Sequence, residues 1–131
     1  RPGQDLLIQA LSGLANITGS EDQPPTPVGV SAVDHHGAMI FAMAILAALL
    51  RRQQTGEGEY LDVSVVEGVL SLTSLYIDDH LATGATPGPR HDVLTGRYAF
   101  YDTYECKDGG WVAVGAIEPH FFEFSGVTII F

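Results

Sequence analysis

The chain has 131 residues, of which 46% are hydrophobic and 17% are charged, and this composition excludes an intrinsically disordered protein. Six Lys and Arg oppose sixteen Asp and Glu, so the formal charge is -10 at pH 7, which argues against binding to nucleic acid or to an anionic membrane. The one cysteine, Cys106, cannot form an internal disulfide, so we expect a reducing, cytoplasmic location.

The first part of the chain predicts two helices joined by a proline-rich loop. Leucines and alanines recur at helical spacing over residues 4–14, which predicts a helix that ends near Gly13. Residues 20–31 contain three prolines and predict an extended loop. The uninterrupted apolar residues at 38–50 predict a second helix, and Asp34 is its expected N-cap.

The apolar run at 38–50 raises the question of a membrane segment. Its thirteen residues are fewer than the roughly 20 that a bilayer requires. Arg51 and Arg52 suit the negative end of a helix dipole, and Gly56 and Gly58 follow as stop signals. We therefore expect a buried core helix and no membrane segment.

The middle of the chain predicts a strand, a helix and a loop. Residues 59–66 alternate between polar and apolar side chains, which is typical of a strand. Residues 66–81 are again largely apolar and predict a helix. Residues 82–97 are rich in glycine and proline and predict a loop.

The last part predicts a β-hairpin followed by a helix. An Asp-Gly pair, Asp108 and Gly109, lies between two strand-like runs at 98–106 and 111–117, which is a strong hairpin signal. Pro119 suits the first turn of a helix.

Few residues fit a known kind of reactive site. The sequence has no pair of cysteines, no metalloprotease or serine-hydrolase motif and no phosphate-binding loop. Adjacent residues of a helix point about 100° apart, so His35 and His36 are poorly placed to share a metal ion, and we expect none. Two carboxylates remain, Asp34 before the apolar helix and Glu118 after an apolar strand. Each is either an acid at a helix start or a reactive group.

Both ends of the chain are unusual for a complete protein. The first residue is Arg1 and not Met, and the apolar residues 126–131 close the sequence. We therefore expect a piece of a longer protein.

Several motifs, in order, resemble the family III CoA-transferases, a superfamily that also contains the α-methylacyl-CoA racemases. The resemblance runs from about Gly3 to Glu123. It is carried by VDHHG at 33–37 before the apolar helix, RRQQTGEGEYLDVS at 51–64, VEGVL at 66–70, FYDTYECKDG at 100–109 and VAVGAIEPHFF at 112–122.

The resemblance implies an α/β fold, of which this chain is a central fragment with helices, a linker strand and a β-hairpin. Residues 1–82 would belong to the large CoA-transferase domain, 83–97 to a linker loop and 98–131 to the start of the small domain. Members of the family are longer, form interlocked homodimers and bind CoA mainly through an N-terminal part. We therefore expect this chain by itself to be inactive.

By this resemblance, Asp34 matches the catalytic aspartate of the family. In the transferases it attacks an acyl-CoA thioester, forms a mixed anhydride and then an aspartyl-CoA thioester, and passes CoA to a carboxylic acid. Burial would remove water from the carboxylate, and a helix N-terminus would offer fixed N–H donors to the oxyanion. CoA is then a substrate, and neither a cofactor nor a metal is implied.

The racemases instead place a histidine and a glutamate on opposite faces of the α-carbon. Glu118 matches the glutamate, but Gln4 of Gly3-Gln4-Asp5 stands where the histidine would, and an amide cannot move a proton near neutral pH. We therefore expect CoA transfer between an acyl-CoA and a carboxylic acid. The alternatives are a racemase or epimerase, and an inactive fragment or assembly element. The expected substrate contacts are Gln4, His35, His36 and Tyr101.

Overall fold

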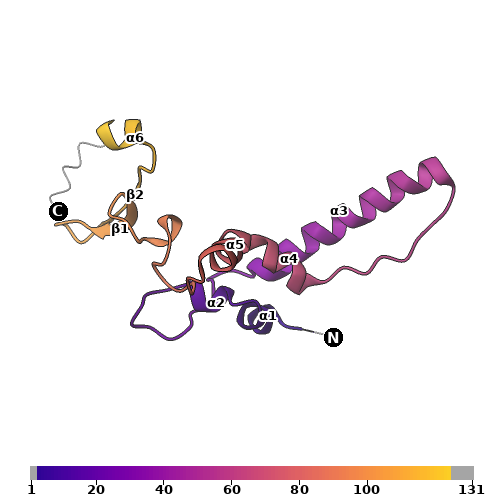
Figure 1. Cartoon of the computed structure of the whole chain (residues 1–131), viewed down its shortest axis with the longest axis horizontal. Coiled ribbons are helices and arrows are strands. Elements are labelled where there is room, and N and C mark those ends of the chain that lie inside the picture. Colours follow the sequence, from indigo (N-terminus) through magenta and orange to yellow (C-terminus); the bar gives the residue numbers. More distant parts are fainter. Residues whose placement is uncertain (1–2, 125–131) are drawn as a thin grey trace.

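The structure is a computed structural model that describes residues 3–124, so the apolar ending at 126–131 lies outside the described residues. Helices come first, and a β-hairpin with a short helix follows them (Figure 1). In chain order the elements are α1 (Asp5–Leu11), α2 (Leu14–Ile17), α3 (Ala32–Thr55), α4 (Val65–Leu72), α5 (Ser74–Thr83), the 3₁₀ helix η1 (Val93–Thr95), β1 (Tyr101–Glu105), β2 (Trp111–Gly115) and α6 (Pro119–Phe124).

Helix α3 is longer than the apolar run that predicted it. It begins at Ala32, directly after Ser31, and ends at Thr55, where Gly56 takes a left-handed conformation (φ 77°) and donates its N–H to the carbonyl of Arg52. Only glycine adopts that conformation without steric cost, which explains the end of the helix at this residue. The predicted N-cap was wrong, because Asp34 lies inside the first turn of the helix.

The small core lies where α1 and α4 pack against the start of α3. Val33 of α3 and Val69 of α4 are fully buried there. Two glycines allow the close approach of α3 and α4. A Cβ atom on Gly37 would lie 2.9 Å from a methyl group of Val65, and one on Gly68 would lie 2.8 Å from Ile40.

Three of the predicted elements differ from the structure in their extent. The helix predicted at 4–14 is divided into α1 and α2 at Gly13, whose φ is 80°. The helix predicted at 66–81 begins at Val65 and is divided into α4 and α5 at Thr73. The strand predicted at 59–66 was wrong, because residues 57–64 form neither helix nor strand and residues 65–66 belong to α4. A strand is stable only when its N–H and C=O groups pair with a neighbour, and alternation of side chains alone does not supply one.

The C-terminal part follows the prediction closely. Strands β1 and β2 are antiparallel, with Tyr101 opposite Gly115 and Glu105 opposite Trp111. The turn between them holds Gly109 at a φ of 82°. Helix α6 begins at Pro119, as predicted, and the loop predicted at 82–97 contains one short helical turn, η1.

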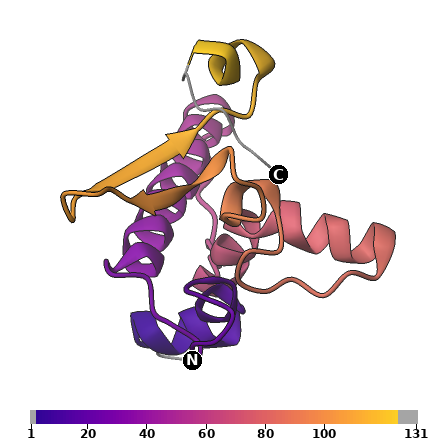
Figure 2. The same cartoon turned by 90° about the vertical axis from the view of Figure 1, so that its left-hand side faces the viewer.

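Most of α3 is exposed, which differs from the buried core helix that we expected. The C-terminal half of the helix projects away from the other elements (Figure 1), and Figure 2 shows the same structure along its long axis. By length and composition α3 could cross a membrane, with a mean hydropathy of 1.7, although core helices of soluble proteins meet the same criterion. The length of the apolar run therefore does not decide between the two, and the absence of a membrane segment stays a prediction. The exposed apolar side chains of α3 include Met39, Met43, Leu46 and Leu50, each 59–65% accessible.

We expect the 131-residue chain, when produced by itself, to self-associate through α3, because exposed apolar patches of this extent are covered in stable proteins. Size-exclusion chromatography should show species larger than a monomer. A variant with Met43→Glu, Leu46→Glu and Leu50→Glu should shift the chain toward the monomer. A sharp monomer peak of the unmodified chain, with a cooperative thermal transition, would contradict this expectation.

Candidate active site

The backbone N–H of Asp34 is hydrogen-bonded, whereas its carboxylate is free within the part of the chain that the structure describes. Asp34 is the third residue of α3 and its side chain is exposed, so the burial expected from the sequence is absent here. Within residues 3–124, its carboxylate takes part in no hydrogen bond or ion pair with another side chain, whereas its backbone N–H donates to Asp5. The group is therefore accessible to a ligand without first breaking an internal contact.

Asp5, and not Asp34, caps the start of α3. One oxygen of its carboxylate, Oδ1, accepts the N–H groups of Val33 and Asp34 at 2.9 and 3.0 Å. The other oxygen accepts a hydrogen bond from the Gln9 amide at 2.5 Å. Asp5, far from α3 in the sequence, thus supplies the cap that the residues beside the helix do not, and Gln9 holds Asp5 in place.

The hydrogen bonds to Asp5 stabilise its charged form. The N–H of Asp34 is the largest cause, followed by the amide of Gln9, and together they hold the pKa of Asp5 below its ordinary value of 3.8. Because the folded pKa is lowered, this stabilisation is present above pH 3.8 and is lost as the pH falls through the folded pKa.

The first turn of α3 has no N–H group left for an oxyanion. Ala32 donates to the carbonyl of Val30 at 2.8 Å, and the next two N–H groups, of Val33 and Asp34, donate to Asp5. The sequence-based expectation that these donors stabilise an oxyanion was therefore wrong. Any oxyanion bound at this end of α3 would have to be stabilised by donors from other residues.

The two histidines that follow Asp34 point to different partners. The ring Nδ1 of His35 lies 2.7 Å from the carbonyl of Ser31, at the start of the same helix. The ring Nε2 of His36 lies 3.0 Å from the carbonyl of Gly68, on α4. In the described part of the chain, no group of three or more His, Cys, Asp or Glu residues is arranged to hold a metal ion.

Gln4 directly precedes Asp5, the residue that bonds to the backbone of Asp34. It is exposed, it precedes α1, and its carbonyl accepts the N–H of Ile8 at 3.1 Å. Its neighbour Asp5 is bonded directly to the backbone of Asp34. The fold therefore brings residues 30 positions apart to the same end of α3.

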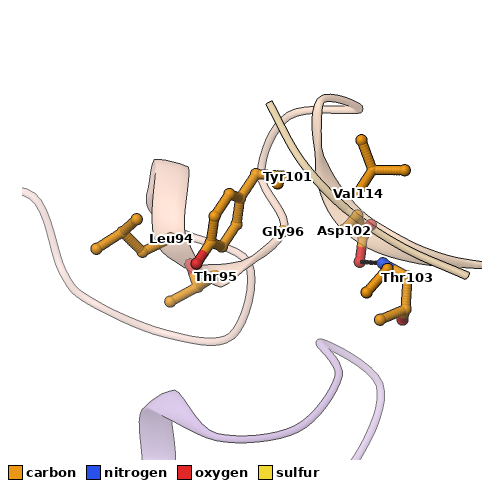
Figure 3. A pocket seen from close by; sticks show the side chains of 9 residues that line it. Leu94, Thr95, Gly96, Tyr101, Asp102, Thr103 and Val114 are labelled. Atoms are coloured by element: carbon orange, nitrogen blue, oxygen red, sulfur yellow. Dashed lines mark hydrogen bonds between the residues drawn. The ribbon is translucent and has the colours of Figure 1, made fainter. Parts of the chain in front are cut away.

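Glu118 and Tyr101 lie elsewhere in the chain. Glu118 is exposed and directly precedes α6, which both views place well away from the start of α3 (Figures 1 and 2). Tyr101 opens β1 and lines a pocket of about 350 Å³ between the hairpin and η1. Its ring extends toward Leu94 and Thr95 (Figure 3). Within one chain, neither residue joins Asp34 in a single site.

An ion pair borders the pocket beside Tyr101. Arg90 binds the carboxylate of Asp102, which is one of the lining residues, and Arg90 has a left-handed backbone with φ at 56°. The pair links the loop after α5 to the hairpin.

The chain matches the family model of CoA-transferase family III over residues 1–125. The chain belongs to this family. It is 36% identical over 123 residues to succinyl-CoA:mesaconate CoA-transferase of Haloarcula hispanica, which covers 92% of this chain and 30% of the relative. It is 38% identical over 123 residues to human alpha-methylacyl-CoA racemase, with 92% of this chain and 32% of the relative covered.

A solved structure supports the fold. A CAIB/BAIF family protein from Brucella suis superposes with a TM-score of 0.73 and 29% identity, over 85% of this chain and 29% of that protein. Membership of CoA-transferase family III and the α/β fold that the resemblance implied are thereby confirmed. The chain spans about a third of the length of the curated relatives that it matches.

The candidate site predicted from the sequence did not include Asp5 and Gln9. Asp5 accepts the backbone N–H of Asp34, and Gln9 bonds to Asp5. Gln9 is only 2% accessible, and besides its bond to Asp5 its side-chain oxygen accepts the N–H of Val28 at 2.9 Å. A buried amide inside an apolar helix is a weak signal in a single sequence, because its partners lie up to 19 residues away.

Proposed function

We propose that the whole protein, of which these residues form all or part, transfers CoA from an acyl-CoA thioester to a carboxylic acid, with Asp34 as the nucleophile. The observation that carries this proposal is the free carboxylate of Asp34 on a backbone that Asp5 holds at the start of α3. Similarity to a CoA-transferase of Haloarcula hispanica supports the reaction class.

The reaction proceeds through two covalent intermediates on Asp34. The carboxylate of Asp34 attacks the thioester carbonyl, the C–S bond breaks, and CoA leaves as its thiolate with a mixed anhydride on the enzyme. The thiolate then attacks the Asp34 carbonyl of the anhydride and releases the first carboxylate, which leaves an aspartyl-CoA thioester. The acceptor carboxylate reverses these steps and departs as the new acyl-CoA.

A second candidate function is 1,1-proton transfer, because the chain is also 38% identical to a human racemase. Glu118 matches the glutamate of that reaction. Gln4 is the feature that favours transfer, because it stands near Asp34 where a racemase has its histidine, and its amide cannot act as a base.

The partners follow from the proposed chemistry. The substrates are an acyl-CoA and a carboxylic acid, without a further cofactor, and we place the protein in the cytoplasm. The separation of Glu118 from Asp34 within one chain and the exposed apolar surface of α3 support a homodimer, in which a second subunit completes the site. The 131 residues alone should then be inactive.

Chemical trapping tests the nucleophile. The whole protein is incubated with an acyl-CoA in the absence of acceptor, treated with hydroxylamine or borohydride, and digested for mass spectrometry. We expect the modified peptide to carry the change on Asp34. Modification of another residue would show that the nucleophile is assigned wrongly.

A further inference from the structure

A single hydrogen-bonded cluster joins α1 to the loop at Val28 and to the start of α3. Asp5 bonds to two backbone N–H groups that lie 28 and 29 residues further along the chain. Gln9, one turn after Asp5 on α1, bonds to Asp5 through its amide nitrogen and to the N–H of Val28 through its oxygen. We call these two side chains, Asp5 and Gln9, the α3 clamp.

The α3 clamp restrains the backbone of the proposed nucleophile itself. One of the two N–H groups that Asp5 binds belongs to Asp34, so this bond fixes the peptide plane from which the Asp34 side chain departs. Val33, whose N–H is the second donor, is fully buried against the core, and Gln9 is 2% accessible. The clamp is therefore anchored in the core through Gln9, although the carboxylate that it positions is exposed.

The hydrogen bonds to Asp5 also cap the N-terminus of α3. The residues beside the helix start do not cap it, since the Ser31 side chain accepts no backbone N–H of the first turn. Without Asp5, the N–H groups of Val33 and Asp34 would have no acceptor, and the first turn could move independently of α1. A displacement of about 1 Å at a reacting group can reduce a rate on the order of 100-fold.

We propose that Asp5 is a positioning residue that holds the Asp34 carboxylate in the geometry required for attack on the acyl-CoA thioester. This inference rests on the proposed function, in which Asp34 is the nucleophile. Asp5 itself does not touch the reacting atoms. It acts on Asp34 through the backbone N–H that it accepts.

The test compares four forms of the whole protein by the rate at which a single turnover with acyl-CoA releases the first carboxylate, per folded molecule. Asp5→Ala removes the acceptor, and we expect acylation of Asp34 to slow on the order of 100-fold, with KM for acyl-CoA unchanged within about twofold. Asp5→Asn keeps an oxygen in the same place and should retain the rate within about tenfold. Asp5→Glu keeps the charge but moves it by one methylene, so it should be slower than Asp5→Asn.

The order of Asn and Glu separates positioning from a purely electrostatic role, which would favour Glu. If Asp5→Ala does not fold, the comparison of Asp5→Asn with Asp5→Glu still tests the positioning role. Ser64→Ala is the matched control, because the Ser64 hydroxyl caps α4 by accepting the N–H of Glu67 at 3.3 Å. That variant should lower thermal stability and leave the acylation rate of the folded protein unchanged.

The outcomes distinguish the two proposals. If the wild-type protein is acylated at Asp34 and both Asp5→Ala and Asp5→Glu react at its rate, the positioning role is wrong and the proposed function stands. The positioning role is also wrong if Asp5→Glu reacts faster than Asp5→Asn. If the wild-type protein forms no adduct at Asp34, the proposed function fails, and the inference about Asp5 fails with it.

Discussion

Replacement of Asp34 by Asn should reduce CoA transfer by about 10⁴-fold or more, because an amide cannot form the anhydride on which both half-reactions depend. The fold should be retained. The Asp34 carboxylate takes part in no hydrogen bond or ion pair with another side chain in residues 3–124, and the bond from Asp34 to Asp5 uses the backbone N–H, which Asn keeps. The experiment measures the steady-state formation of acyl-CoA by chromatography, beside the circular dichroism spectrum and melting temperature of the same preparation.

Asp22→Asn is the matched control for this substitution. Asp22 is an exposed carboxylate in the loop before α3, and its replacement changes the net charge by the same amount. We expect that variant to transfer CoA at the wild-type rate. An Asp34→Asn protein that folds normally and transfers CoA within about tenfold of wild type would exclude Asp34 as the nucleophile.

The sequence predicted the elements whose signals are local. The Asp108-Gly109 turn sets the hairpin, Gly56 ends α3, and Pro119 opens α6, and each of these was confirmed. Each depends on the conformational preference of one or two residues, so no knowledge of the tertiary structure is required.

Elements whose outcome depends on distant contacts were predicted poorly. Residues 59–64 alternate as a strand does, but the described part of the chain offers them no pairing partner. Gly13 and Thr73 divide helices that hydrophobic spacing alone makes continuous. The thirteen apolar residues at 38–50 also gave no measure of the full length of α3, because polar residues interrupt the apolar pattern on both sides of the run, at 34–36 and 51–55.

The same distinction applies to the candidate site. Asp34 could be selected from its place before an apolar helix and from the family motif around it. Its cap could not, because the partner of its N–H is 29 residues earlier in the chain and no local rule connects the two. The oxyanion donors were assigned wrongly for the same reason, since a free helix N-terminus was assumed where Asp5 already occupies two of the donors.

The α-hydrogen of a bound acyl-CoA should be retained in heavy water, because racemisation requires a base on each face of the α-carbon and Gln4 supplies none. Glu118 alone can act on one face only, and CoA transfer itself breaks no bond at the α-carbon. Proton NMR in heavy water, with a chiral 2-methylacyl-CoA and the whole protein, should show an unchanged α-hydrogen signal. Addition of an acceptor acid to the same sample should start CoA transfer, which demonstrates that the enzyme is active.

Gln4→His converts this prediction into a comparison within one protein. The side chain at position 4 is exposed and its neighbour Asp5 bonds to the backbone of Asp34, so a histidine can be accommodated there and can receive a proton. We expect this variant to gain measurable α-deuteration while Asp34→Asn does not. Fast deuteration and loss of optical purity in the wild-type protein would overturn the transferase assignment. The missing base would then have to be His35 or His36, and each would first have to release its present hydrogen bond, to Ser31 or to Gly68.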